Sequence, residues 1–225
     1  MRVLEEIYPS IYSADHLFLH DELMKVDKAG FQELHVDIQD GIFTPNMSFG
    51  MRVVDGLRKY TAMRFNVHLM VLNPEYYIQR LKATGGIRVV YFHPSAVRYP
   101  SELITEINSM GAQAGCALNP IEVIEELIYY KDKIGAFLVG TAEPDNSGGL
   151  FAHGSLQKIR RLRKLFGEEI EIVVDGNINA ETLPIAQEAG ANRFVVGRAL
   201  FQAPKIQEAL GELENALASK HGAVT

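Results

Sequence analysis

The chain has 225 residues, of which 47% are hydrophobic and 22% are charged, and its formal net charge at pH 7 is −6. This composition is typical of a globular protein, and no apolar run approaches the ~20 residues that span a bilayer. The absence of a basic cluster argues against nucleic acid as a partner. Acidic residues among the first seven positions stand where a signal peptide has its apolar stretch, so we expect a cytoplasmic protein. The single cysteine, Cys116, is flanked by small and apolar residues and is expected to be buried.

Eight short apolar or β-branched runs recur at intervals of roughly 25 to 30 residues, and each is followed by a segment with apolar residues at helical spacing. The helical spacing is clearest over Leu19–Val26, Leu156–Phe166 and Ile206–Leu217. We expect strands near Ile7–Tyr12, Glu33–Ile38, Phe65–Met70, Val89–His93, Gln113–Leu118, Ala136–Thr141, Glu171–Asp175 and Arg193–Val196.

Glycines between these elements support the same architecture. They stand at positions 30, 85, 86, 111, 167 and 190, where each ends a helical segment just before a strand, as a left-handed C-terminal cap does. No linker or low-complexity stretch interrupts the eight units. The pattern therefore predicts an α/β fold, a single (β/α)₈ TIM barrel over residues 1–225, in preference to a doubly wound sheet.

Four residues in these runs have side chains that bind metals. His35 and Asp37 are two residues apart, so their side chains leave the same face of a strand. We place both late in their strand, and His68 and Asp175 late in two others, because the C-terminal strand ends of a barrel converge on its active face. Two imidazoles and two carboxylates suit one divalent ion such as Zn²⁺, Mn²⁺ or Fe²⁺. His93 also ends a predicted strand, where it either contacts a substrate or packs as a structural residue.

Six motifs give the chain a resemblance, nearly from end to end, to the ribulose-phosphate 3-epimerase family of sugar-phosphate epimerases. The motifs are Pro9–Asp15, His35–Asp37, Asp40–Asn46, Val67–Met70, Leu118–Pro120 and Val174–Gly176. The resemblance implies a barrel of the ribulose-phosphate-binding type. It implies one divalent metal ion, with Zn, Mn, Fe and Co as candidates, and the ligands His35, Asp37, His68 and Asp175.

The resemblance also implies that Asp37 and Asp175 are the catalytic acid and base. One aspartate would remove the proton beside the carbonyl of a ketose phosphate, and the other would return a proton from the opposite face. The metal would act as a Lewis acid toward the enediolate intermediate. Ribulose 5-phosphate, xylulose 5-phosphate and allulose 6-phosphate are candidate substrates. A homo-oligomer, either a dimer or a hexamer, is expected, whereas nucleic acid and membranes are not expected as partners.

The loop after the sixth strand departs from the family's sequence but stands where the family has its glycine-rich phosphate-binding loop. The resemblance implies that, together with the last two strand ends, it would cradle a phosphate with backbone N–H groups. Asp145 adds a negative charge to this loop. Arg198 is expected to bind the phosphate, to pair with Asp145 or to form a surface salt bridge. The resemblance places the substrate contacts at Ser10, Met70, Asn146, Ser147, Gly148, Gly176, Asn177, Gly197 and Arg198.

Three positions depart from the family's pattern. Gln39 and Gly140 stand where the family has methionines, which predicts a wetter pocket and a specialised paralogue that acts on a different sugar. Asn66 stands where the family has an aspartate, and if it orients His68, its amide would weaken metal binding. Asp145, Gly140 and Asn66 leave open a second hypothesis, a non-catalytic sugar-phosphate-binding barrel. A decarboxylase or aldolase is disfavoured, because no lysine stands where a barrel decarboxylase or a Schiff base needs one.

Overall fold

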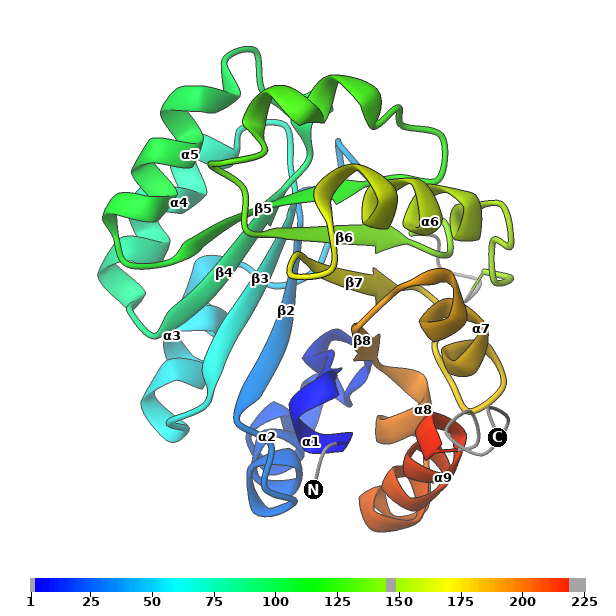
Figure 1. Cartoon of the computed structure of the whole chain (residues 1–225). Coiled ribbons are helices and arrows are strands. Elements are labelled where there is room, and N and C mark those ends of the chain that lie inside the picture. Colours follow the sequence, from blue (N-terminus) through cyan, green and yellow to red (C-terminus); the bar gives the residue numbers. More distant parts are fainter. Residues whose placement is uncertain (1–2, 145–148, 219–225) are drawn as a thin grey trace.

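The fold is a closed barrel of eight parallel strands, seen in a computed structural model that describes residues 3–144 and 149–218 (Figure 1). The strands pair in the order β1-β8-β7-β6-β5-β4-β3-β2, and a parallel bridge between Ser10 and His35 joins β2 back to β1. The predicted TIM barrel is therefore confirmed. The strands are β1 (Ile7–Pro9), β2 (Glu33–Gln39), β3 (Arg64–Met70), β4 (Ile87–Phe92), β5 (Gln113–Leu118), β6 (Ala136–Gly140), β7 (Glu171–Asp175) and β8 (Arg193–Val196).

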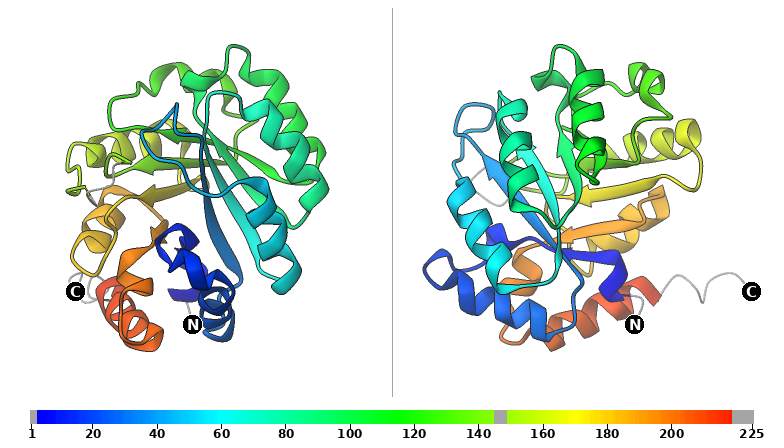
Figure 2. Two further views of the ribbon diagram at one scale, coloured as in Figure 1. Left: turned by 180° about the vertical axis from the view of Figure 1, so that it is seen from behind. Right: turned by 90° about the vertical axis from the view of Figure 1, so that its left-hand side faces the viewer.

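Helices surround the sheet, as the two further views show (Figure 2). The connection from β5 to β6 differs from the expected pattern, because it contains the 3₁₀ helix Glu125–Tyr130 and no α-helix. Across the described ranges, every helix is too short or too polar to cross a bilayer. The helices are α1 (Val3–Glu6), α2 (Leu19–Lys28), α3 (Met51–Tyr60), α4 (Pro74–Thr84), α5 (Pro100–Ser109), α6 (Ser155–Phe166), α7 (Thr182–Ala189), α8 (Arg198–Phe201) and α9 (Ile206–Ala218).

Three strands, β1, β4 and β6, end earlier than the sequence predicted, and the changes in β1 and β4 affect residues at the barrel mouth. β1 ends at Pro9, so Ser10 follows the strand and residues Ile11–Ser13 form a short 3₁₀ helix. β4 ends at Phe92, so His93 follows the strand as well. The next residue, Pro94, has no N–H to extend the ladder. Ser10 and His93 are therefore presented at the C-terminal end of the barrel.

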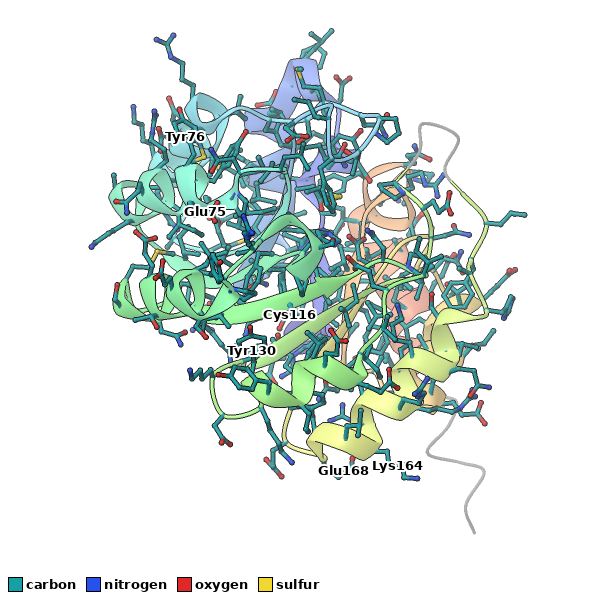
Figure 3. All side chains as sticks on the ribbon, turned by 90° about the horizontal axis from the view of Figure 1, so that it is seen from above. Glu75, Tyr76, Cys116, Tyr130, Lys164 and Glu168 are labelled. Atoms are coloured by element: carbon teal, nitrogen blue, oxygen red, sulfur yellow. The ribbon has the colours of Figure 1, made fainter. Side chains whose placement is uncertain are left out.

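Alternate residues along the strands face two separate apolar cores. The outer core lies between the sheet and the helices and includes Cys116, which is 1% exposed. Figure 3 shows Cys116 well inside the molecule, whereas Lys164 and Glu168 lie at its rim. Burial raises the pKa of the Cys116 thiol, so the prediction of a buried cysteine is confirmed. The inner core fills the barrel with Tyr8, Val89, Tyr91, Ala117, Ala136, Leu138, Val173 and Val195.

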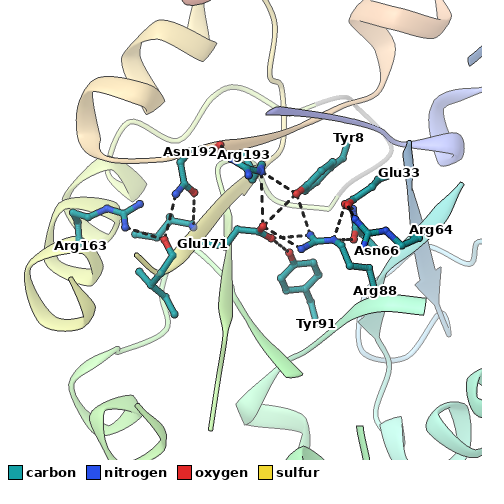
Figure 4. A network of polar contacts seen from close by, with 12 residues as sticks. Tyr8, Glu33, Arg64, Asn66, Arg88, Tyr91, Arg163, Glu171, Asn192 and Arg193 are labelled. Atoms are coloured by element: carbon teal, nitrogen blue, oxygen red, sulfur yellow. Dashed lines mark hydrogen bonds and ion pairs between the residues drawn. The ribbon is translucent and has the colours of Figure 1, made fainter. Parts of the chain in front are cut away.

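A network of polar side chains closes the N-terminal end of the barrel (Figure 4). Arg88 lies at its centre, with Nε 2.6 Å from Oε2 of Glu33 and Nη2 2.8 Å from Oε1 of Glu171. The pairing of β3 with β4 shifts at Arg88, and this β-bulge turns its side chain into the barrel. Buried charges require such partners, because leaving water is costly. We name this cluster the floor network; its members are Tyr8, Glu33, Asn66, Arg88, Tyr91, Glu171 and Arg193.

Candidate active site

Two histidines and two aspartates meet above the inner core, where the strands end. Their ligand atoms all lie within 4.8 Å of one another. Oδ1 of Asp37 is 3.2 Å from Nε2 of His35 and 3.3 Å from Nδ1 of His68. Oδ2 of Asp175 is 3.9 Å from the same His35 nitrogen and 3.6 Å from the same His68 nitrogen. The structure thus brings together all four residues that the sequence predicted as ligands.

The strand pairing explains how the cluster forms. His35 and Asp37 share one face of β2, and Asp37 is the direct register partner of His68 on β3. Asp175 is the last residue of β7. The prediction that every ligand lies late in its strand is wrong for His35, which is the third of seven residues in β2 and is completely buried. Its ring lies at the base of the cluster and reaches the carboxylates through Nε2.

The cluster favours a charged Asp37 and a protonated His68. Burial raises the pKa of Asp37, but His35 and His68 outweigh this effect and hold the pKa well below its usual range. For His68, burial lowers the pKa, whereas the hydrogen bonds and charges of Asp175 and Asp37 raise it to about 9. In the metal-free chain at neutral pH, His68 therefore carries a proton between two carboxylates.

The donor set and its spacing fit a divalent metal ion. Tetrahedral coordination with bonds of about 2.0–2.2 Å separates neighbouring ligand atoms by about 3.3–3.6 Å. The four nitrogen–oxygen distances in the cluster run from 3.2 to 3.9 Å. Imidazole and carboxylate ligands suit ions such as Zn²⁺, Mn²⁺ and Fe²⁺. The Asp175 side chain is 25% exposed, so the cluster has one side that a substrate can approach.

Ser10 orients the buried aspartate. Its hydroxyl donates a hydrogen bond of 2.7 Å to Oδ2 of Asp37, while Oδ1 of the same carboxylate faces the two histidines. Both oxygens of Asp37 thus have fixed partners. Ser10 was expected as a substrate contact, and it lines the cavity above the cluster as well.

A cavity of about 860 Å³ opens above the cluster. His35 lies below this cavity, whereas the other three predicted ligands line it. Asp145 and the predicted substrate contacts Asn146, Ser147 and Gly148 lie outside the described residues. The other predicted substrate contacts all line the cavity; they are Ser10, Met70, Gly176, Asn177, Gly197 and Arg198.

Two glycines allow loops to approach closely on the side of the cavity where the sequence placed a phosphate. Gly176 has φ +119°, and a Cβ there would lie 2.5 Å from the backbone nitrogen of Ala142. A Cβ at Gly197 would overlap the hydroxyl of Ser13. Arg198 Nη2 donates a hydrogen bond of 3.4 Å to Oδ1 of the neighbouring Asn177. Backbone from several strand ends therefore surrounds this side of the cavity.

The departure at Gln39 gives the cavity a polar wall. Gln39 is 5% exposed, and its Nε2 donates to Sδ of Met70 at 3.8 Å. Its Oε1 is buried and has no hydrogen-bond partner among the described residues. Gly140 lines the same cavity. An unpaired amide oxygen at this place is available to a hydroxyl group of a substrate.

Asn66 does not orient His68, so the condition under which its amide would weaken metal binding is not met. Its Nδ2 donates to Oε2 of Glu33 at 2.9 Å, and its Oδ1 accepts from Nε of Arg88 at 2.8 Å. Asn66 shares the barrel-facing side of β3 with His68 but lies two residues earlier, in the floor network. Its amide therefore serves the floor network.

His93 contacts the imidazole of His68 in place of Asn66. The two Nε2 atoms are 2.9 Å apart, and His93 is 2% exposed. Nδ1 of His93 is 3.6 Å from Oε2 of Glu122. The sequence left the role of His93 open and gave Glu122 no role. The available signal was a carboxylate that follows the end of β5 by four residues.

Fold and site together define a TIM-barrel enzyme with a ligand set of two histidines and two aspartates. The chain belongs to the ribulose-phosphate 3-epimerase family, whose model matches residues 6–201. A ribulose-phosphate 3-epimerase of Methanocaldococcus jannaschii is 36% identical over 214 residues, covering 94% of this chain and 90% of the relative. Another, of Bacillus subtilis, is 33% identical over 212 residues, covering 92% and 97%. Membership of this family makes the chain an isomerase, an epimerase acting on carbohydrates.

Solved structures with the same fold include enzymes of other kinds. A thiamine phosphate pyrophosphorylase from Pyrococcus furiosus superposes with a TM-score of 0.64 at 15% identity, covering 98% of this chain and 99% of that one. An orotidine 5'-phosphate decarboxylase from Pyrococcus horikoshii gives 0.65 at 15% identity, covering 94% and 98%. At this identity, the likeness concerns the barrel alone.

Proposed function

We propose that this chain is a divalent-metal-dependent epimerase that inverts carbon 3 of a ketose phosphate. Candidate substrates are ribulose 5-phosphate, which would become xylulose 5-phosphate, and a hexulose phosphate such as allulose 6-phosphate. The observation that carries the proposal is the pair of carboxylates, Asp37 and Asp175, within a histidine-bearing cluster under a cavity of about 860 Å³. The relatives described above carry the name of this reaction.

The two aspartates have the arrangement that inversion through two bases requires. They come from β2 and β7, which are separated in the barrel by β1 and β8. A single base tends to return its proton to the face from which it came, whereas a second base can protonate the opposite face. We assign proton removal and proton return to these two carboxylates, each base serving one direction of the reaction. Ser10 holds the Asp37 carboxylate in place.

His35, Asp37, His68 and Asp175 would hold the metal ion. When bound, this ion would supply Lewis-acid stabilisation for the negative charge that develops on the ketose oxygens. The chain itself contributes the bases, the shape of the cavity and the backbone around Gly176 and Gly197. We place the phosphate of the substrate on this side, beside Asn177 and Arg198, together with residues 146–148.

We also propose that residues 1–225 form one domain. The last helix, α9, packs against α1 and α7, so the end of the described chain returns to its beginning. The inner core is built from residues of six of the eight strands, β1 and β4 to β8. No part of the barrel could therefore be removed without exposing this core.

The test uses a panel of ketose phosphates in D₂O with added Mn²⁺, Zn²⁺, Fe²⁺ or Co²⁺. Inversion and deuterium incorporation at carbon 3 are followed by NMR, and the metal content of each protein is measured. Asp37→Asn and Asp175→Asn should each stop inversion, and each should retain proton exchange with only one of the two epimers. Asp132→Asn, which changes an exposed aspartate, is the control. The absence of exchange at carbon 3 with every sugar and every ion would contradict the proposal.

The same experiment separates the enzyme from a non-catalytic binder. Thermal stabilisation by a ketose phosphate without deuterium incorporation would favour the binder. One of the departures that raised this alternative, Asn66, belongs to the floor network, and its side-chain amide is hydrogen-bonded to Glu33 and Arg88. The ligand set itself is complete.

A further inference from the structure

We propose that Glu122 is a positioning residue, which acts through His93 to fix the tautomer of His68 that presents a bare Nδ1 to the metal. This inference rests on the proposed metal site and goes beyond it, because neither Glu122 nor His93 belongs to the ligand set. The three side chains follow one another from the mouth of β3 to the loops after β4 and β5. They form a chain of polar contacts that leads away from the cluster, and we name this chain of Glu122, His93 and His68 the relay.

The first contact joins the two imidazoles. Nδ1 of His68 faces Asp37 and Asp175, and its other nitrogen, Nε2, lies 2.9 Å from Nε2 of His93. The ring centroids are 5.1 Å apart and the ring planes differ by 30°, so the two rings meet edge to edge at these nitrogens. Two ring nitrogens at this separation share a single hydrogen, so one donates and the other accepts. The direction of this hydrogen bond decides which tautomer His68 adopts.

The surroundings of His93 decide that direction. His93 is 2% exposed, and each of its ring nitrogens faces one partner: Nε2 faces the imidazole of His68, and Nδ1 faces the carboxylate of Glu122. Its Nδ1 is buried without a hydrogen bond among the described residues, and the nearby acidic oxygen is Oε2 of Glu122, at 3.6 Å. A carboxylate beside Nδ1 favours the proton on that nitrogen. Nε2 of His93 is then the acceptor, and His68 donates to it from Nε2.

This direction matters for metal binding. A neutral histidine that donates from Nε2 has a lone pair on Nδ1, which is the atom that faces the aspartates. The opposite direction would put the proton of His68 on Nδ1 and block that atom as a ligand. Partners of this kind commonly fix the tautomer and orientation of ligating histidines. The contacts of His93 therefore select the binding-competent form of His68.

Glu122 is itself held in place. The backbone N–H of Asn119 donates to its Oε2 at 2.6 Å, and the hydroxyl of Ser95 donates to its Oε1. Burial raises the pKa of Glu122, but His93, Ser95 and the Asn119 N–H together lower it below its ordinary value. The carboxylate is therefore ionised at neutral pH. It has a fixed orientation toward His93.

Two variants of Glu122 separate the relay from general structural effects. Glu122→Ala removes the acceptor and should weaken Mn²⁺ binding about 10- to 100-fold. Glu122→Gln can turn its amide oxygen toward His93 and Asn119 and its NH₂ toward Ser95. Its Mn²⁺ affinity should therefore fall less than about tenfold. Glu126→Ala removes an exposed carboxylate from the same loop and should bind Mn²⁺ like the wild type. Dissociation constants are measured by competition with a chelator.

Nitrogen-15 NMR of the Zn²⁺-loaded protein supplies a readout that a purely structural role would not change. The wild type should show the proton of His93 on Nδ1 and that of His68 on Nε2, and Glu122→Ala should redistribute the His93 proton. A wild-type His93 protonated on Nε2 would overturn the proposal without any variant. Wild-type affinity in Glu122→Ala would overturn the relay alone. A wild-type chain that binds neither Mn²⁺ nor Zn²⁺ would overturn the metal site and the relay together.

Discussion

The proton on His68 should compete with metal binding. Its pKa of about 9 compares with an ordinary value of 6.5, because Asp175 and Asp37 stabilise the protonated ring. Because pH 7 lies about two units below this pKa, the metal must displace a bound proton. This should reduce the apparent metal affinity at pH 7 about 100-fold, or about 2.7 kcal/mol. The affinity should rise about tenfold for each pH unit from 7 to 9 and then level off.

Isothermal titration calorimetry measures this competition. Mn²⁺ is titrated into the metal-free protein at pH 7.5 in buffers of different ionisation enthalpy, and the slope gives the number of protons released. We expect about one proton for each ion bound. His20→Gln is the control, because His20 is 56% exposed and lies outside the cluster. Binding without proton release, together with an affinity that is flat from pH 7 to 9, would refute this reasoning.

The same proton should stabilise the metal-free fold. Because the pKa of His68 is raised in the folded chain, its contribution is fully present below the unfolded pKa and is lost as pH rises through the folded value. The free energy of unfolding of metal-free protein should fall by on the order of 3 kcal/mol between pH 6.5 and pH 9.5. Urea denaturation measures the fall, and His68→Gln should make the profile flatter. An equally steep profile in that variant would assign the effect to another group.

Three further substitutions test the floor network, the polar wall of the cavity at Gln39 and the hydrogen bond from Ser10 to Asp37. Arg88→Met removes the cation that Glu33 and Glu171 share and should cost about 3–5 kcal/mol of unfolding free energy in urea, with Arg80→Met, at an exposed site, as the control. A loss below 1 kcal/mol would contradict the central place of Arg88. Gln39→Met removes an unpaired buried oxygen and should stabilise the fold by about 1 kcal/mol while changing the ranking of ketose phosphates by kcat/KM; an unchanged ranking would separate Gln39 from substrate choice. Ser10→Ala frees one oxygen of Asp37 and should lower kcat about tenfold with intact metal binding; wild-type kcat would show that the hydrogen bond is dispensable.

The barrel and the ligand set could be predicted from the sequence because both follow from simple periodicities. Alternation along a strand puts His35 and Asp37 on one face, and closure of the barrel brings His68 and Asp175 to the same end. These rules hold whatever the neighbouring side chains are. Strand ends were less predictable. β1 ends at Pro9, but proline also occurs in edge positions of strands, so the sequence pattern did not show that the strand stops there.

The floor network and the relay depend on features that no local pattern shows. Arg88 alternates out of phase with Val89 and Tyr91, so strand periodicity directs it outward, and only the shift in pairing turns it inward. Glu122 lies in a loop, and its neighbour His93 comes from another strand end, 29 residues earlier in the chain. Loop carboxylates of this kind are usually solvated, so sequence alone favours the wrong assignment.

On β2 and β3 one face contributes to three levels of the barrel, which explains how these strands can depart from the family's pattern and keep their ligands. On β2 the successive barrel-facing residues contribute to the floor, the ligand cluster and the cavity wall; they are Glu33, His35, Asp37 and Gln39. On β3 the same order is Asn66, His68 and Met70. Asn66 and Gln39 therefore change the levels below and above the ligands while the ligands themselves stay fixed. Under the proposed function, a change confined to the cavity wall would alter which sugar fits and would leave the two aspartates and their histidine partners in place.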